Sequence, residues 1–133
     1  MIYDVLDHTA DLKVRIYGNS YTSIFQNSVI TISDLIMDRN LLKPGFNKTI
    51  EIEKNSPDNI LVNLLNDILF YMEYENVIYF GSKLDFTENR LHGRIFGSSI
   101  PDNVEYRNVI KAATYYDLKV DPEHGFAMVV FDI

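Results

Sequence analysis

The sequence predicts a single α+β domain in which two amphipathic helices pack against a mostly antiparallel sheet. Three observations lead to this fold class. A segment near the N-terminus alternates apolar and polar residues, two later segments repeat apolar residues at helical spacing, and the chain after Glu75 is rich in β-branched and aromatic residues. The 133 residues correspond to one domain, residues 1–133, which is long enough to bury a core without disulfides.

The alternating segment predicts a half-buried strand over residues 10–17, which Gly18 ends. We expect a helix over residues 21–37 to follow, with Ser20 as its N-cap. The apolar stripe of this helix repeats every three or four residues and consists of Ile24, Phe25, Ser28, Val29, Ile32, Leu35 and Ile36.

A second helix is expected after a short strand over residues 49–53. The sequence Ser56-Pro57-Asp58 is typical of a helix start, because serine caps the first turn, proline fits it and a carboxylate is favoured near the positive helix end. The apolar face of this helix consists of Ile60, Leu61, Leu64, Leu65, Ile68, Leu69 and Met72.

Four strands are expected in the remainder of the chain, over residues 77–86, 90–96, 109–120 and 126–131. Glu88-Asn89 is typical of a hairpin turn between the first two of these strands. The last strand contains no charged residue, so we expect it to be central in the sheet and covered on both faces.

Charge and composition narrow the classes of function. Twelve Lys and Arg against nineteen Asp and Glu give a net charge of −7, and the basic residues stand singly. Nucleic-acid binding relies on clustered positive charge, so direct binding of RNA is not predicted, whereas an acidic surface would favour a basic protein partner. The alternative is that negative charge only keeps the domain soluble.

The N-terminus does not resemble a signal peptide, residues 16–33 are too polar to span a membrane, and cysteine is absent, so we expect a cytoplasmic protein.

The sequence contains no pattern that predicts a catalytic centre. The three histidines have no metal-ligand spacing, and without cysteine a structural zinc site is not expected. The chain also has no glycine-rich phosphate loop and no recognisable nucleophile motif. No catalytic residue is therefore predicted.

Two carboxylates stand at strand ends instead. Asp11 begins the first alternating strand and Asp132 ends the last one, so antiparallel neighbouring strands would bring both to one edge of the sheet. Ile133 would add its backbone carbonyl and a free α-carboxylate. Such oxygen ligands suit Ca²⁺ or Mg²⁺. The alternatives are that both aspartates simply face water, that His8 only holds the turn between Asp7 and Asp11 together, and that Lys111 is an ordinary edge residue with its charge in solvent.

Four segments resemble the archease family, in the order in which the family has them and over essentially the whole chain. They are Asp7-His8-Thr9-Ala10-Asp11 followed by Gly18, the helical segment 61–69, Lys111-Ala112-Ala113-Thr114-Tyr115, and Phe131-Asp132-Ile133. The sequence differs from the family pattern at Tyr116, where histidine is frequent, at Ser98, where an acidic residue is common, and near Leu64, where tryptophan is often found.

The resemblance implies an α+β fold with an embedded strand-helix-strand-strand module. It implies a metal site, with calcium or another hard divalent ion such as Mg²⁺ or Mn²⁺, at Asp11, Asp132 and Ile133. Asp7, His8 and Lys111 would contact the partner or support the motif.

The function that the resemblance implies is that of a non-enzymatic, chaperone-like activator of the RtcB-type RNA ligase in tRNA splicing and RNA repair. Such an activator promotes guanylylation of the ligase and its multiple turnover, and it would meet RNA only indirectly. Two alternatives remain open from the residues alone. One is a small metal-dependent phosphohydrolase that holds its ion with Asp11 and Asp132, and the other is a non-catalytic adaptor domain whose metal only fixes the C-terminus.

Overall fold

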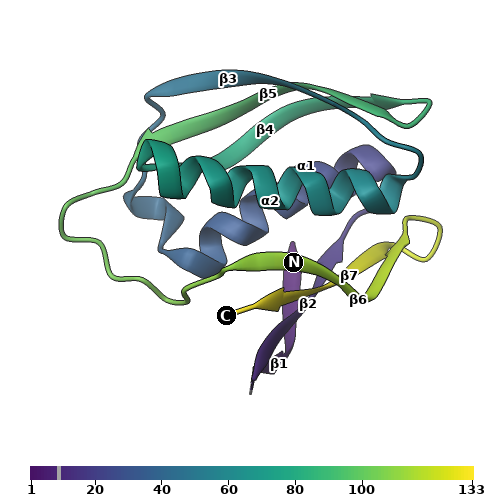
Figure 1. Cartoon of the computed structure of the whole chain (residues 1–133), viewed down its shortest axis with the longest axis horizontal. Coiled ribbons are helices and arrows are strands. Elements are labelled where there is room, and N and C mark those ends of the chain that lie inside the picture. The colour runs from purple at the N-terminus through teal and green to yellow at the C-terminus, as the bar shows by residue number, and fades with distance from the viewer. Residues whose placement is uncertain (9) are drawn as a thin grey trace.

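The structure is a computed structural model and describes residues 1–8 and 10–133, apart from the side chain of His8. Seven strands, two helices and a short 3-10 turn follow one another along this part of the chain (Figure 1). In chain order they are β1 (Tyr3–His8), β2 (Asp11–Tyr17), α1 (Tyr21–Ile36), η1 (Arg39–Leu41), β3 (Phe46–Glu53), α2 (Pro57–Glu75), β4 (Val77–Thr87), β5 (Arg90–Ser99), β6 (Ala112–Asp121) and β7 (Phe126–Asp132).

The strands form two sheets, with both helices between them (Figure 1). One sheet has four strands in the order β1-β2-β7-β6, and the other has three in the order β3-β5-β4. All five strand pairs are antiparallel. The predicted α+β class is confirmed, and β3, α2, β4 and β5 form the strand-helix-strand-strand module. The expectation of one sheet is wrong, because the helices bury apolar side chains on both sides and each side requires its own sheet.

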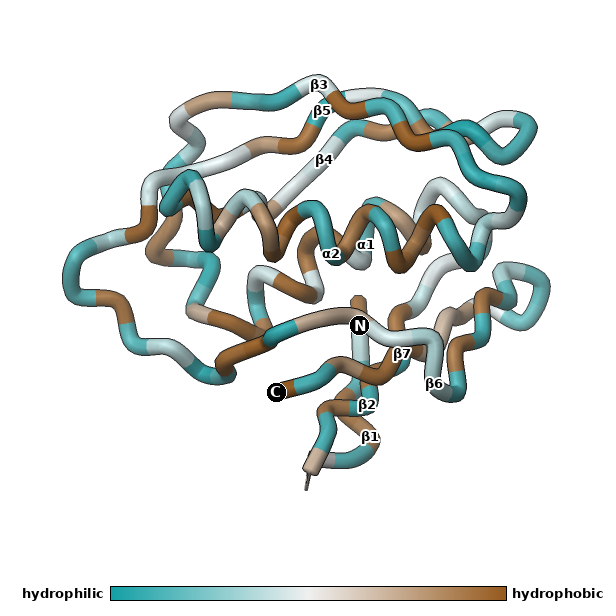
Figure 2. The backbone as a smooth tube through the Cα atoms, viewed as in Figure 1, coloured by the Kyte–Doolittle hydropathy of each residue, from teal (hydrophilic) through white to brown (hydrophobic). Residues whose placement is uncertain are grey.

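Both helices begin where the sequence predicts. The Ser20 hydroxyl accepts from the Ser23 N–H at 3.0 Å while the Ser23 hydroxyl accepts from the Ser20 N–H at 3.0 Å, which is a reciprocal capping box. The Ser56 hydroxyl accepts from the Asn59 N–H at 3.2 Å, and Pro57 is the first helical residue. Polar and apolar residues recur along both helices (Figure 2), and the apolar stripes predicted for them are buried, with Met72 only partly covered.

One hydrophobic core joins the two sheets through the helices. On β2 and β7, the core face consists of directly opposed pairs such as Leu12 with Phe131 and Val14 with Val129, all less than 2% exposed. Burial of each such side chain contributes about 1.5–3 kcal/mol. This apolar face therefore fixes the β2–β7 register, since a slip by one residue would turn these side chains to solvent.

Strand β7 is central, as predicted, but its outer face is only partly covered. Phe126 and Met128 are partly exposed on that face, while the helices pack against the opposite one (Figure 1). Long basic side chains provide the remaining cover: the Arg15 guanidinium lies 5.2 Å and the Lys119 ammonium 5.4 Å from the centroid of the Phe126 ring. A strand without charge can therefore border solvent when its neighbours supply such side chains.

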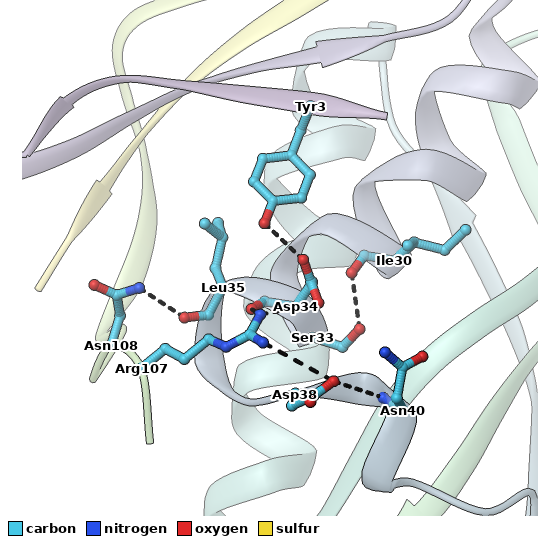
Figure 3. A network of polar contacts seen from close by, with 9 residues as sticks. All are labelled: Tyr3, Ile30, Ser33, Asp34, Leu35, Asp38, Asn40, Arg107 and Asn108. Atoms are coloured by element: carbon cyan, nitrogen blue, oxygen red, sulfur yellow. Dashed lines mark hydrogen bonds and ion pairs between the residues drawn. The ribbon is translucent and has the colours of Figure 1, made fainter. Parts of the chain in front are cut away.

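The loop between β5 and β6 is fixed to the C-terminal end of α1 (Figure 3). The Arg107 guanidinium donates to the main-chain oxygen of Asp34 at 3.0 Å and to its carboxylate at 3.1 Å. The N–H of Arg107 donates to the Ile36 carbonyl at 2.7 Å, and the Asn108 amide donates to the Leu35 carbonyl at 2.7 Å. A remote loop thus satisfies carbonyls that the helix end leaves unpaired and brings a cation to its negative pole.

Tyr3 ties β1 to this same helix end, and its titration gives a testable prediction. The Tyr3 hydroxyl donates to the Asp34 carboxylate at 2.7 Å (Figure 3), and burial together with this hydrogen bond raises the pKa of Tyr3 from 10.0 to about 12. The unfolded chain therefore loses this proton first, so stability from Tyr3 is fully present below pH 10 and is lost as pH rises through about 12.

We expect Tyr3→Phe to flatten the fall in unfolding free energy over this window in urea titrations. Tyr106→Phe, at an exposed tyrosine, should keep the wild-type slope, and identical slopes for both variants would contradict the prediction.

Candidate functional site

Asp11 and Asp132 are directly opposed in the β2–β7 pair. Directly opposed residues of an antiparallel pair have side chains on the same face, with Cβ atoms about 4.5–5.5 Å apart. Because Leu12 and Phe131 face the core, the two aspartates project on the outer face, where both are exposed. The expectation that these two strand ends meet at one edge of the sheet is therefore confirmed.

The main chain around Asp132 is held from its other side as well. Ala112 of β6 is the register partner of Asp132, and the N–H of Lys111 donates to the Asp132 carbonyl at 2.8 Å. Ile133 continues from this point and packs its side chain against the core. The last strand and the segment before β6 thus fix the main chain from which the Asp132 side chain projects.

A small cavity of about 210 Å³ opens beside Asp11 on the outer face. Asp7, Asp11, Lys13, Tyr116 and Asp117 are among the residues that line it. The Lys13 ammonium lies 3.6 Å from the Asp117 carboxylate and pairs with one of the three acidic groups. The cavity is therefore acidic overall, with one cation inside it.

Asp117 is a cavity residue that the sequence did not predict. The register of β6 and β7 shifts between Thr114 and Lys119, and Asp117 has a φ of 50° within this irregularity. The bulge turns Tyr116 and Asp117 out of the alternation that a regular strand over 109–120 would have. In the sequence, Tyr115-Tyr116-Asp117 places three side chains with polar groups in succession, which interrupts the alternation of a strand and is the signal that could have identified the bulge.

Two of the remaining predicted site residues, Asp7 and Lys111, lie close to the aspartate pair. Asp7 of β1 is the register partner of Lys13 and lines the cavity. Lys111 lies just before β6. This strand begins at Ala112 and not at residue 109 as expected, because one main-chain hydrogen bond, from Lys111 to Asp132, is the pairing found for the described residues 109–111. The side chain of His8 and the whole of Thr9 lie outside the described residues.

The chemistry of the opposed pair fits a hard cation. Like charges directly opposite each other in a sheet are destabilising, and a cation between them would remove that repulsion. Within residues 1–8 and 10–133, no group of three or more His, Cys, Asp or Glu side chains is placed to hold a metal. The donor set would therefore consist of two carboxylates and main-chain oxygen from Ile133, which suits an oxygen-preferring ion such as Ca²⁺.

Comparison with known proteins identifies the family. Residues 3–133 match the family model described as the Archease protein family (MTH1598/TM1083). The chain belongs to the archease family. Family relatives include the protein archease of Thermoplasma volcanium, 42% identical with full coverage of both chains. That of Thermoplasma acidophilum is 40% identical, over 98% of this chain and 93% of the relative.

Solved structures in the archease family share the fold. The solution structure of Methanobacterium thermoautotrophicum protein 1598 is 23% identical, with a TM-score of 0.78 and 99% coverage of both chains. The crystal structure of a Thermotoga maritima protein, described as an archease and possible chaperone, is 20% identical with a TM-score of 0.66, over 98% of this chain and 96% of that one. These similarities confirm the α+β fold. In the part of this chain that the structure describes, no helix has the length and apolarity needed to cross a membrane.

Proposed function

We propose that this protein is a non-enzymatic, chaperone-like activator of an RtcB-type RNA ligase, and that it promotes guanylylation and repeated turnover of that ligase. One observation supports this proposal above the others. In a member of the archease family, Asp11 and Asp132 are directly opposed and exposed at the ends of β2 and β7, where another protein can reach them. An exposed acidic end suits action on a partner better than chemistry inside this chain.

Asp11 and Asp132 would hold a divalent cation, with Ile133 adding main-chain oxygen. We propose Ca²⁺, or another hard ion such as Mg²⁺ or Mn²⁺. Bound there, the ion would supply positive charge for a phosphate group or a carboxylate of the partner. The bond from the Lys111 N–H to the Asp132 carbonyl holds the strand end in place, and the Lys111 side chain is exposed beside it, free to contact the partner.

The charge distribution supports a protein partner over direct RNA contact. The net charge is −7, and five of the twelve basic residues, Lys13, Lys48, Arg90, Arg107 and Lys119, already lie within 4.0 Å of carboxylates. The other seven basic residues stand singly in the sequence and offer no cluster for a phosphate backbone, whereas an acidic domain is steered toward a basic protein. We therefore propose that RNA is met only through the ligase, in the cytoplasm.

The dimensions of the site support an activator over a phosphohydrolase. The cavity beside Asp11 has about 210 Å³, below the roughly 300–1,000 Å³ of typical small-molecule sites. An activator instead needs differential affinity: it must bind the productive state of the ligase more tightly than the resting state. The exposed aspartate pair can provide this difference in affinity when the productive state of the ligase, and not the resting state, presents groups that bind the pair or its ion.

Ligation with RNA in excess over the ligase tests the proposal. We expect product to stop near one equivalent of ligase without this protein and to rise to many equivalents with it. Asp132→Ala should remove the rise, whereas Asp85→Ala, at an exposed carboxylate on the other sheet, should retain it. Product that stays at one equivalent with wild type would refute the activator function. Unchanged turnover with lowered thermal stability in Asp132→Ala would instead indicate an adaptor whose ion is only structural.

A further inference from the structure

An apolar groove lies between α2 and the segment that leads into β6. We call it the α2 groove; it has a volume of about 640 Å³, and its walls include Leu69, Phe70, Tyr74, Val109 and Ile110. Leu69 and Ile110 are buried and form its floor, while Phe70, Tyr74 and Val109 are 54%, 70% and 70% exposed. Three large apolar side chains are therefore held at the surface around one depression.

The position of the two rings on α2 is not explained by the core. The core-facing side of this helix includes Leu61, Leu65 and Leu69, whereas Phe70 and Tyr74 are one helical turn apart on the side that faces solvent. Their ring centroids are 4.4 Å apart and the ring planes are inclined by 33°, so the two rings form one contiguous apolar surface. Contiguous exposed apolar surface of this kind marks interaction sites.

Two charged residues in the walls of the α2 groove indicate which charges a bound segment would carry. Glu73 lines the α2 wall and Lys111 lines the opposite wall, and both are exposed. Neither belongs to the ion pairs found among residues 1–8 and 10–133. An occupant that complements both walls would carry apolar anchors with Lys or Arg toward Glu73 and Asp or Glu toward Lys111.

The α2 groove adjoins the main chain of the strand end that carries Asp132. Its wall residue Ala112 is the register partner of Asp132, and the N–H of Lys111 donates to the Asp132 carbonyl at 2.8 Å. A partner that extends around β6 can therefore contact both the Asp11–Asp132 pair on the outer face and the groove on the α2 side. In the chain fold, α2 packs over β6, the strand that pairs with β7 (Figure 1).

We propose that the α2 groove is the docking site for an amphipathic segment of the protein partner. This inference takes the RNA ligase of the proposed function as that partner. The apolar anchors of the segment would insert between Tyr74 and Val109, and its charges would pair with Glu73 and Lys111. Docking would supply the affinity, and it would hold the partner in the orientation in which it faces the two aspartates.

Calorimetric titration of purified ligase into this protein tests the inference. Val109→Asp places a charge in the apolar wall, and Glu73→Lys reverses one wall charge, so each should weaken binding about tenfold or more. Leu41→Asp is the matched control, because Leu41 is 56% exposed but lies on η1, outside the groove. It should bind like wild type. Thermal unfolding of each variant verifies that the fold is retained. Should Val109→Asp be unfolded, the affinity of Glu73→Lys decides the test.

The outcomes separate this inference from the proposed function. Wild-type binding that is weakened by the groove substitutions and not by Leu41→Asp supports the docking site. Equal affinities for all variants, with normal ligase turnover, would overturn the docking site and leave the activator function standing. Absence of binding by wild type would overturn the docking site outright, and the turnover assay would then show whether the activator function fails as well.

Discussion

Gly93→Ala is expected to lower the free energy of unfolding by at least about 3 kcal/mol. Gly93 lies in β5, the middle strand of the three-stranded sheet, and has a φ of 146°. A Cβ at this position would lie 2.2 Å from the Lys83 carbonyl oxygen and 3.0 Å from the Leu84 Cα. Both are main-chain atoms of the neighbouring strand, so neither can move away without loss of the β4–β5 pairing.

The strain and the overlap add to each other. A non-glycine residue in a sparsely populated conformation costs about 1–3 kcal/mol, and forced overlap in a packed region costs a similar amount. Urea denaturation should show the loss, together with a melting temperature lower by roughly 10 °C. Gly81→Ala is the matched control in the neighbouring strand, because its Cβ would meet only a Phe96 ring atom at 3.9 Å. Similar stabilities of the two variants would show that β5 does not approach β4 this closely.

The local elements of this fold are encoded in short stretches of sequence, which is why they could be predicted. Ser20 and Ser56 cap their helices, and Glu88 and Asn89 form the hairpin turn with φ values of 52° and 59°. Each of these depends only on neighbours a few residues away. Strand β1 could not be predicted, because its register shifts between Val5 and Asp7 and the apolar alternation is interrupted.

The choice of strand partners was beyond the sequence pattern. Alternation shows which face of β2 is buried but not that β2 pairs with β7, far away along the chain, or that β3, β4 and β5 form a sheet of their own. The opposed position of Asp11 and Asp132 followed from one assumption, that the two strands are antiparallel neighbours, and that assumption is correct. Asp117 reaches the same region only through a bulge, which depends on tertiary packing.

Asp11→Asn and Asp132→Asn should each weaken Ca²⁺ binding by about a hundredfold, because each removes one of the two aspartate carboxylates proposed to hold the ion. Calorimetric titration measures this change. Asp85→Asn should retain the wild-type affinity, since Asp85 is exposed on β4 of the other sheet. Extension of the chain beyond Ile133 should also weaken binding if its terminal carboxylate is a ligand, whereas an N-terminal extension should not.

Stability without the ion should change in the opposite direction, and this distinguishes a metal site from two aspartates that merely face water. Removing one of two directly opposed like charges should leave the metal-free protein unchanged or more stable by about 0.2–1 kcal/mol. Wild type should gain about 2.7 kcal/mol from Ca²⁺ at a hundred times its dissociation constant, and the Asn variants should gain almost nothing at that same concentration. Thermal unfolding with and without Ca²⁺ measures both effects. If Ca²⁺ stabilises wild type and Asp132→Asn equally, the ion binds elsewhere, because the opposed pair is the only feature that the substitution alters in charge.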